Sequence, residues 1–262
     1  MNSTRWSRLR RKVFRTDYEI DIELAQSAGL DTGGIYNGIK DPGNQLIYRY
    51  ICEFVKAALL VGNTRPVEKI KILDWGGGKG YATYFLSRMG FDVVCFEMNN
   101  FQHRKIWQKH NLNVLLSDGP NLPFESKTFD AIIGLGVLEH VPYDYDALKE
   151  LNRTLKDDGM LFIFNLPNKR GYINHIWHMK KMYYHDRTYS IQESKMLLKR
   201  SGFKFVGKPW YRQLFPKRLV HFSNFRLAEA IDLFLTNNTP LKYFATDIEF
   251  VAKKQEAYTS EH

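Results

Sequence analysis

A short apolar segment that runs directly into a cluster of glycines is the feature that most constrains this chain. Residues 69–75 are typical of a buried β-strand, and the sequence GGGKG at residues 76–80 follows immediately. Residues 79–89 then have the length and apolar content of a helix. Because glycine accepts positive φ and lets the backbone pass close to a ligand, this order predicts a strand, a tight turn facing a ligand, and a helix.

The same alternation of strand-like and helix-like segments continues along the chain. Further strands are expected at residues 91–96, 113–116, 129–135, 160–165, 203–207 and 247–252. Further helices are expected at residues 45–61, 101–109, 145–155, 191–201 and 227–235. Strands alternating with helices predict an α/β fold with a doubly wound, mostly parallel sheet. Because ligands bind beyond the carboxyl ends of such strands, we expect the site in the loops after residues 75, 97, 117, 135 and 165.

The size and composition of the chain exclude several classes of protein. Its 262 residues suit one α/β domain with additions, and 44% hydrophobic with 25% charged residues is ordinary for a folded protein. No apolar run reaches about 18 residues, and the charged N-terminus lacks the apolar part of a secretory signal. Cys52 and Cys95 show no metal-ligand spacing, which predicts buried, reduced thiols in a cytoplasmic protein.

Positive charge is concentrated in two segments. Residues 1–16 carry six Lys and Arg and residues 194–228 carry nine, while neither segment contains an acid. Such segments either attract an anionic partner or form a solvated surface. In the first segment, apolar residues recur near helical spacing among the arginines, which suits peripheral contact with an anionic membrane. These residues are Trp6, Leu9, Val13 and Phe14.

Acidic side chains occur at the ends of three successive expected strands. Asp74 lies two residues before the first glycine, where it would repel a phosphate and suit a ligand with a cationic amine. The third glycine of the dinucleotide pattern G-x-G-x-x-G is replaced by Tyr81, so no pyrophosphate is required. Glu97 can accept hydrogen bonds from a ribose diol, although it could also be an ordinary acid at a strand end. Asp118 can accept a hydrogen bond from the exocyclic amine of an adenine.

Five motifs in this order resemble those of the class I S-adenosylmethionine-dependent methyltransferases, in particular the branch of quinone-biosynthesis and small-molecule enzymes. They are KILDWGGGKGY at residues 71–81, residues 91–97, SDGPNLPF at residues 117–124, FDAIIGLGVLEHVP at residues 129–142 and LKDDGMLF at residues 155–162. The resemblance covers residues 65–208. It implies a Rossmann-like, seven-stranded sheet whose last strand is antiparallel, with S-adenosylmethionine as the cofactor.

The resemblance also implies a set of cofactor contacts. Asp74 would lie near the methionine amine, Gly76 and Gly78 along the backbone path, Glu97 at the ribose, Met98, Asp118 and Gly119 at the adenine, and Leu135 and Gly136 at the methionine end. Two positions depart from the family pattern. Gly77 stands where a cysteine is common, and Lys79 stands where a small hydroxyl residue is common.

Two histidines are candidates for a catalytic base. His140 follows the fourth strand and would face the mouth of the pocket, although it could also simply pack in this loop. His185 belongs to an aromatic, basic segment after the fifth strand, where the family commonly places substrate contacts. His175 and His178 lie three residues apart, but they have no carboxylate partner, and the family usually needs no metal. We therefore expect no bound metal.

The expected organisation is one methyltransferase domain with additions. We predict a basic and irregular N-terminal extension at residues 1–45, the domain at residues 46–256, and a tail at residues 257–262. Within the domain, residues 166–189 are expected to form a lid and residues 209–242 a cap insertion over the substrate entrance. Because the cap is basic, we expect an anionic or carbohydrate-bearing acceptor.

The leading prediction is an S-adenosylmethionine-dependent O-methyltransferase that acts on a sugar, a glycolipid or another anionic small molecule by in-line displacement. One alternative is an RNA methyltransferase, which only the basic segments support. The other is a cofactor-binding partner subunit without catalysis. A cytoplasmic location is expected, with peripheral membrane contact through the basic N-terminus, and the oligomeric state is left open.

Overall fold

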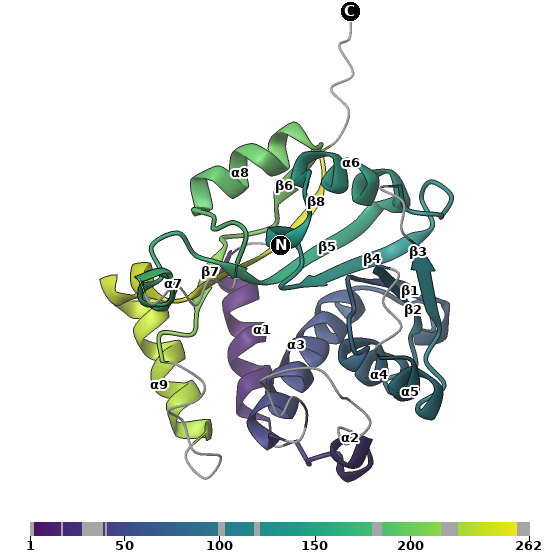
Figure 1. The fold of residues 1–262 in the computed structure, drawn as a ribbon, viewed down its shortest axis with the longest axis horizontal. Coiled ribbons are helices and arrows are strands. Elements are labelled where there is room, and N and C mark those ends of the chain that lie inside the picture. The colour runs from purple at the N-terminus through teal and green to yellow at the C-terminus, as the bar shows by residue number, and fades with distance from the viewer. Residues whose placement is uncertain are drawn as a thin grey trace, which may run out of the picture.

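A mixed β-sheet forms the centre of the computed structural model, which describes residues 3–16, 18–27, 39, 41–98, 103–117, 121–179, 185–215 and 225–255. The strand order is β3-β2-β1-β4-β5-β8-β6, and β7 pairs with β8 (Figure 1). The strands are β1 (Lys71–Trp75), β2 (Asp92–Met98), β3 (Val114–Ser117), β4 (Phe129–Leu135), β5 (Leu155–Pro167), β6 (Phe203–Phe205), β7 (Trp210–Arg212) and β8 (Asp247–Lys254). β1 to β5 pair in parallel, and β8 is antiparallel to β5, β6 and β7.

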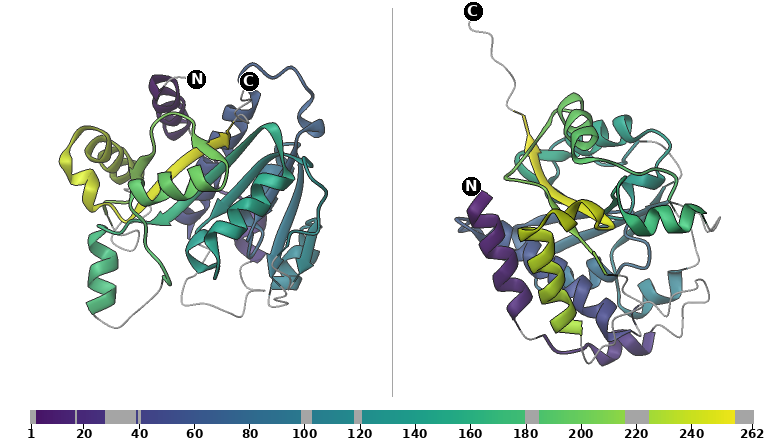
Figure 2. Two further views of the ribbon diagram at one scale, coloured as in Figure 1. Left: turned by 90° about the horizontal axis from the view of Figure 1, so that it is seen from above. Right: turned by 90° about the vertical axis from the view of Figure 1, so that its left-hand side faces the viewer.

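Helices cover both faces of this sheet. α6 and α8 lie on one face, and α1, α3 and α4 lie on the other, each side with its own apolar core (Figures 1 and 2). The α-helices are α1 (Ser3–Arg15), α2 (Ile22–Ser27), α3 (Pro42–Leu60), α4 (Tyr81–Arg88), α5 (Arg104–Lys109), α6 (Asp144–Thr154), α7 (Tyr172–Met179), α8 (Ile191–Arg200) and α9 (Phe225–Asn238). The 3-10 helices are η3 (Val67–Lys69), η5 (Leu138–His140) and η8 (Pro240–Phe244). No described helix is long and apolar enough to cross a bilayer.

The doubly wound, mostly parallel sheet and its antiparallel last strand are confirmed, while two details differ from expectation. β5 begins at Leu155 instead of residue 160, because Leu155 already pairs with Phe129 of β4. Asp157 is exposed there and lies 2.6 Å from Lys127 Nζ and 3.5 Å from Lys254 Nζ. The second difference is β7, a three-residue strand inside the expected cap, which adds an eighth strand beside β8.

The expectation of irregular structure before residue 45 is wrong for the described residues. Trp6 and Val13 are seven residues apart, so they lie on the same side of α1. Both are buried in the core that α1 shares with α3, and this burial stabilises the helix. α3 begins at Pro42, earlier than expected, because the Asp41 carboxylate accepts a hydrogen bond of 2.9 Å from Gly43 N. Pro42 and Gly43 therefore form the first turn of the helix.

A buried group of charged and aromatic side chains joins α1 to the C-terminal part of the sheet. The Arg10 guanidinium lies 4.5 Å from the centroid of the Trp210 ring. Trp210 Nε1 donates a 2.7 Å hydrogen bond to Glu249, whose other oxygen lies 3.4 Å from Arg212. Burial lowers the pKa of Arg10 to about 10, so this side chain remains charged at neutral pH. Because unpaired buried charges are costly, α1 and the β7–β8 pair stabilise each other.

We expect Trp6→Ala to lower the free energy of unfolding by about 3–5 kcal/mol, because it removes a large buried side chain. The Trp6 ring lies 5.6 Å from that of Phe54 and packs so closely on Gly207 that a Cβ there would lie 2.8 Å away. Urea unfolding measures the change, with the exposed Arg11→Ala on the same helix as the control. Equal stability of Trp6→Ala and the wild type would mean that α1 is a loose appendage.

Candidate active site

The glycine loop after β1 is held against two neighbouring segments. Gly76 and Gly80 have positive φ values of +64° and +78°. A Cβ on Gly76 would overlap Val137, which follows β4, and a Cβ on Gly80 would lie 2.6 Å from Leu112. Gly76 N also donates a 2.9 Å hydrogen bond to the carbonyl of Phe96 in β2. The ends of β1, β2 and β4 therefore meet at this loop, as the expected ligand site requires.

The unusual Gly77 has a physical reason in the neighbouring strand. A Cβ at this position would lie 2.6 Å from Cys95 Sγ and 2.7 Å from Asp74 Oδ2. The sulfur of Cys95 in β2 thus fills the space that a side chain at residue 77 would need. Any larger residue there would displace the buried Asp74 carboxylate or the thiol.

Asp74 is buried beneath the loop and is bonded to the first turn of α4. Its Oδ2 accepts hydrogen bonds from Thr83 N at 3.0 Å and from Thr83 Oγ1 at 2.6 Å. Burial raises the pKa of the Asp74 carboxyl to about 6, against the lowering effect of the two bonds from Thr83. Asp74 therefore ties β1 to α4. Its direct contact with a cofactor amine stays a prediction.

Glu97 and the glycine loop are brought together as the sequence predicts. Glu97 Oε2 accepts a 2.6 Å hydrogen bond from Gly78 N, so the carboxylate at the end of β2 faces the loop. Gly78 O in turn accepts a 3.0 Å bond from Trp107 Nε1 of α5. Trp107 was not expected here, because nothing in the sequence around it shows that α5 returns to this loop. Met98 extends beyond Glu97 and is largely exposed, a suitable position for contact with a flat ring.

The remaining predicted cofactor residues fall into two groups. Leu135 and Gly136 lie at the end of β4, where Gly136 has φ +61° and its N donates a 3.0 Å hydrogen bond to Phe164 O. They thus share the sheet edge with the glycine loop. Asp118 and Gly119 lie outside the described residues, directly after β3.

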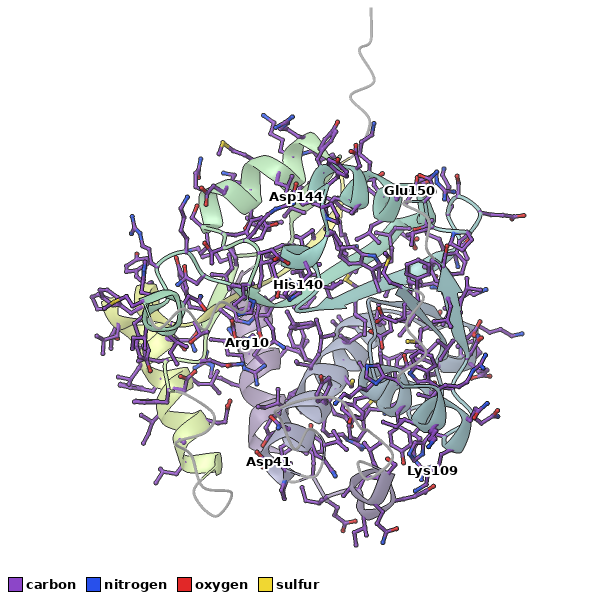
Figure 3. The ribbon with its side chains drawn as sticks, in the orientation of Figure 1. Arg10, Asp41, Lys109, His140, Asp144 and Glu150 are labelled. Carbon is purple, nitrogen blue, oxygen red and sulfur yellow. The ribbon has the colours of Figure 1, made fainter. Side chains whose placement is uncertain are left out.

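His140 and His185 are both beside Glu139, just beyond the end of β4. Their rings stack at a centroid distance of 6.0 Å, although 45 residues separate them in sequence. His140 is labelled in Figure 3. Glu139 Oε1 lies 3.6 Å from His185 Nδ1 and 3.8 Å from His140 Nε2. His140 Nδ1 also lies 3.0 Å from Asp186 Oδ2. We call Glu139, His140 and His185 the base cluster.

Glu139 is the functional candidate that the sequence analysis missed. Its side chain is 1% exposed, and its Oε2 has no hydrogen-bond partner among the described residues. A Cβ on Gly136 would lie 3.5 Å from Glu139 Oε1, so the base cluster adjoins the predicted methionine end of the cofactor site. The three side chains each offer one ligand atom within 4.8 Å of the others, so they could share either a proton or a divalent cation. His175 lies apart on α7 and is exposed, and the side chain of His178 lies outside the described part of the chain.

We expect Asp74→Asn to gain stability relative to the wild type as the pH rises from about 4 to about 7. Because the pKa of Asp74 is near 6 when folded and near 3.8 ordinarily, the folded protein holds this proton more tightly than the unfolded chain. The free energy of unfolding therefore falls by at most about 3 kcal/mol across this window and the loss stays constant above it, whereas asparagine does not titrate. Urea unfolding of both proteins at several pH values checks this. A pH-independent difference would contradict the burial of an ionisable Asp74.

Comparisons with known proteins show the family to which this chain belongs. A family model described as "Methyltransferase domain" matches residues 73–163, which contain the glycine loop, Glu97 and the base cluster except His185. The uncharacterized protein MJ1252 of Methanocaldococcus jannaschii is 30% identical over 70% of this chain and 75% of its own length. The ubiquinone biosynthesis O-methyltransferase of Pelagibacter ubique is also 30% identical, over 47% of this chain and about half (53%) of its own length.

Solved structures show the same fold. The structure titled as a putative sarcosine dimethylglycine methyltransferase from Galdieria sulphuraria aligns with a TM-score of 0.57 at 20% identity, covering 90% of this chain and 99% of that one. One titled as a possible histamine N-methyltransferase from Thermotoga maritima aligns with a TM-score of 0.54 at 18% identity, covering 80% and 98%. These structures agree with the chain in fold, while the family model and the sequence relatives identify the chain as a member of the class I S-adenosylmethionine-dependent methyltransferases, enzymes whose cofactor is S-adenosylmethionine.

Proposed function

We propose that this enzyme methylates a hydroxyl group of an anionic small molecule, with a sugar or a glycolipid as the acceptor class. The observation that carries the proposal is the base cluster beside Gly136, because a hydroxyl must lose its proton when it is methylated. The name of one relative, the ubiquinone biosynthesis O-methyltransferase, supports oxygen as the methylated atom. The acid-free basic segment 194–228 supports an anionic acceptor.

The residues at the ends of β1, β2 and β4 fit the cofactor. Gly76 and Gly78 give a loop without side chains, and the Glu97 carboxylate at its rim can accept bonds from ribose hydroxyls. Gly78 N is bonded to Glu97, so we infer that the ribose would meet a carboxylate already held in place. S-adenosylmethionine supplies a methyl group activated by a positively charged sulfur. The protein therefore has to orient the acceptor, exclude water and take up one proton.

The base cluster is suited to the proton step. His140 is the first candidate to accept the acceptor's proton at a ring nitrogen and His185 is the second, and in either case the imidazolium would lie close to the Glu139 carboxylate. A buried carboxylate without a hydrogen-bond partner favours a positive charge nearby. Asp186 fixes the orientation of the His140 ring through Nδ1, which leaves Nε2 as the nitrogen available to the acceptor.

We expect Glu97→Ala to weaken S-adenosylmethionine binding by at least about tenfold, which corresponds to about 1.4 kcal/mol. The loss follows from removing the carboxylate that faces the ribose, and isothermal titration calorimetry measures it. Asp92→Ala is the matched control, because Asp92 is an exposed acid at the opposite end of the same strand. Equal affinity of Glu97→Ala and the wild type would remove Glu97 from the site.

We expect His140→Ala to lower turnover by about 10²–10⁴-fold while cofactor affinity is preserved, because the variant lacks the base but keeps the glycine loop. Glu139→Gln should also lower turnover, since it removes the charge that stabilises the imidazolium. His175→Ala, an exposed histidine on α7, is the control. Steady-state kinetics on the identified acceptor give the result. A loss below about threefold would make His140 structural.

Chelation distinguishes a proton acceptor from a metal ligand in the same cluster. We expect activity to survive dialysis against EDTA, because the proposed mechanism uses the imidazole itself as the base. Loss of activity that a divalent cation restores would instead assign the three side chains to a metal.

A further inference from the structure

α9 has its polar and apolar sides reversed relative to an ordinary surface helix. The side chains that face the protein include Asp232 and Thr236, which are both buried. The side chains that face outward are Leu227, Ile231 and Phe234, with 64%, 43% and 62% of their surface exposed. A surface helix normally buries its apolar side. An apolar side that faces outward therefore indicates contact with a second surface.

The polar inner side of α9 has a structural role that explains the reversal. The Asp232 carboxylate accepts hydrogen bonds from the backbone N atoms of Gln213, Leu214 and Phe215, directly after β7. Thr236 Oγ1 donates a 2.7 Å bond to the carbonyl of Asp232. α9 is thus attached through a buried acid, and its apolar side is left without a partner in the described protein.

The 3-10 helix that follows α9 also exposes apolar side chains. η8 packs against α9 and adds Leu241 and Phe244, which are 46% and 54% exposed. We call Leu227, Ile231, Phe234, Leu241 and Phe244 the apolar stripe. Single exposed apolar residues such as Ile22 and Met196 are ordinary, but a contiguous set marks an interaction surface.

Positive charge lies beside the apolar stripe. α1 and α9 are side by side in Figure 1 and in the right-hand view of Figure 2. The buried side of α1 carries Arg10, which interacts electrostatically with Glu229 of α9. Its opposite side presents Arg8, Arg11 and Lys12, all exposed, with no acid in the helix. The two neighbouring helices therefore offer an apolar outer side and a cationic outer side.

We propose that the apolar stripe, with the cations of α1 beside it, docks this enzyme on the surface of an anionic lipid bilayer. A helix of 14 residues is about 21 Å long, enough to lie in the plane of the interface with its apolar side in the acyl boundary. Cations on the neighbouring helix α1 (Figures 1 and 2) would add attraction to anionic headgroups. A second copy of the chain fits less well, because a face shared by two copies would bring the same cations together.

Vesicle flotation tests the docking without relying on the proposed acceptor or on methyl transfer. The full chain should float with vesicles of phosphatidylcholine mixed with phosphatidylglycerol, and much less with phosphatidylcholine alone. Leu227→Ser with Phe234→Ser should weaken binding to the anionic vesicles by at least about tenfold. Ile22→Ser with Met196→Ser removes two equally exposed apolar residues elsewhere and should change nothing.

A charge variant and the oligomeric state complete the test. Arg8→Gln, Arg11→Gln and Lys12→Gln combined should weaken anionic binding by at least about tenfold and reduce its salt dependence, while thermal unfolding shows that each variant is folded. Equal flotation of the stripe variant and the wild type would overturn the proposal. So would a dimer in light scattering that Phe234→Ser dissociates, because the stripe would then be an interface between copies.

Discussion

The close contact between the loops after β1 and β4 is the constraint on which the rest of the site depends. Gly76 has no room for a side chain because Val137 occupies that space, so the glycine loop and the segment that continues into Glu139 and His140 are fixed against each other. Two strands that are neighbours in the sheet thus deliver a cofactor loop and a group of proton acceptors to one edge. Any change that separates these loops would affect binding and chemistry together.

The order of elements and several site residues could be predicted from sequence because they depend on local patterns. Strand ends in a parallel sheet meet at one edge, so Gly78 and Glu97 could be placed together before any contact was known. Glu139 and Trp107 could not be found this way, because their roles come from contacts with His185 and Gly78 that tertiary structure creates. The reason for Gly77 could not be found from sequence either, because the Cys95 sulfur that fills the space beside it belongs to a neighbouring strand.

The N-terminal helix α1 and the C-terminal elements β7, β8 and α9 form one structure through contacts between residues that are far apart in sequence. Arginines that suggested a basic tail include Arg10, which is buried on Trp210, while Trp6 and Val13 fill the core next to α3. The reversed sides of α9 follow from the Asp232 carboxylate, whose three backbone partners precede it by 17–19 residues. Amphipathic spacing identified the helix correctly, but it could not show that the apolar side faces outward.

The enzyme thus combines a cofactor site at the ends of β1, β2 and β4 with an outward-facing apolar surface on α9. The most direct measurement is transfer of a radiolabelled methyl group from S-adenosylmethionine to a fractionated extract of the host cells. The result predicted is label in the glycan or lipid fraction, held there as a methyl ether on an acceptor oxygen. Label in RNA, or no label despite measured cofactor binding, would contradict it.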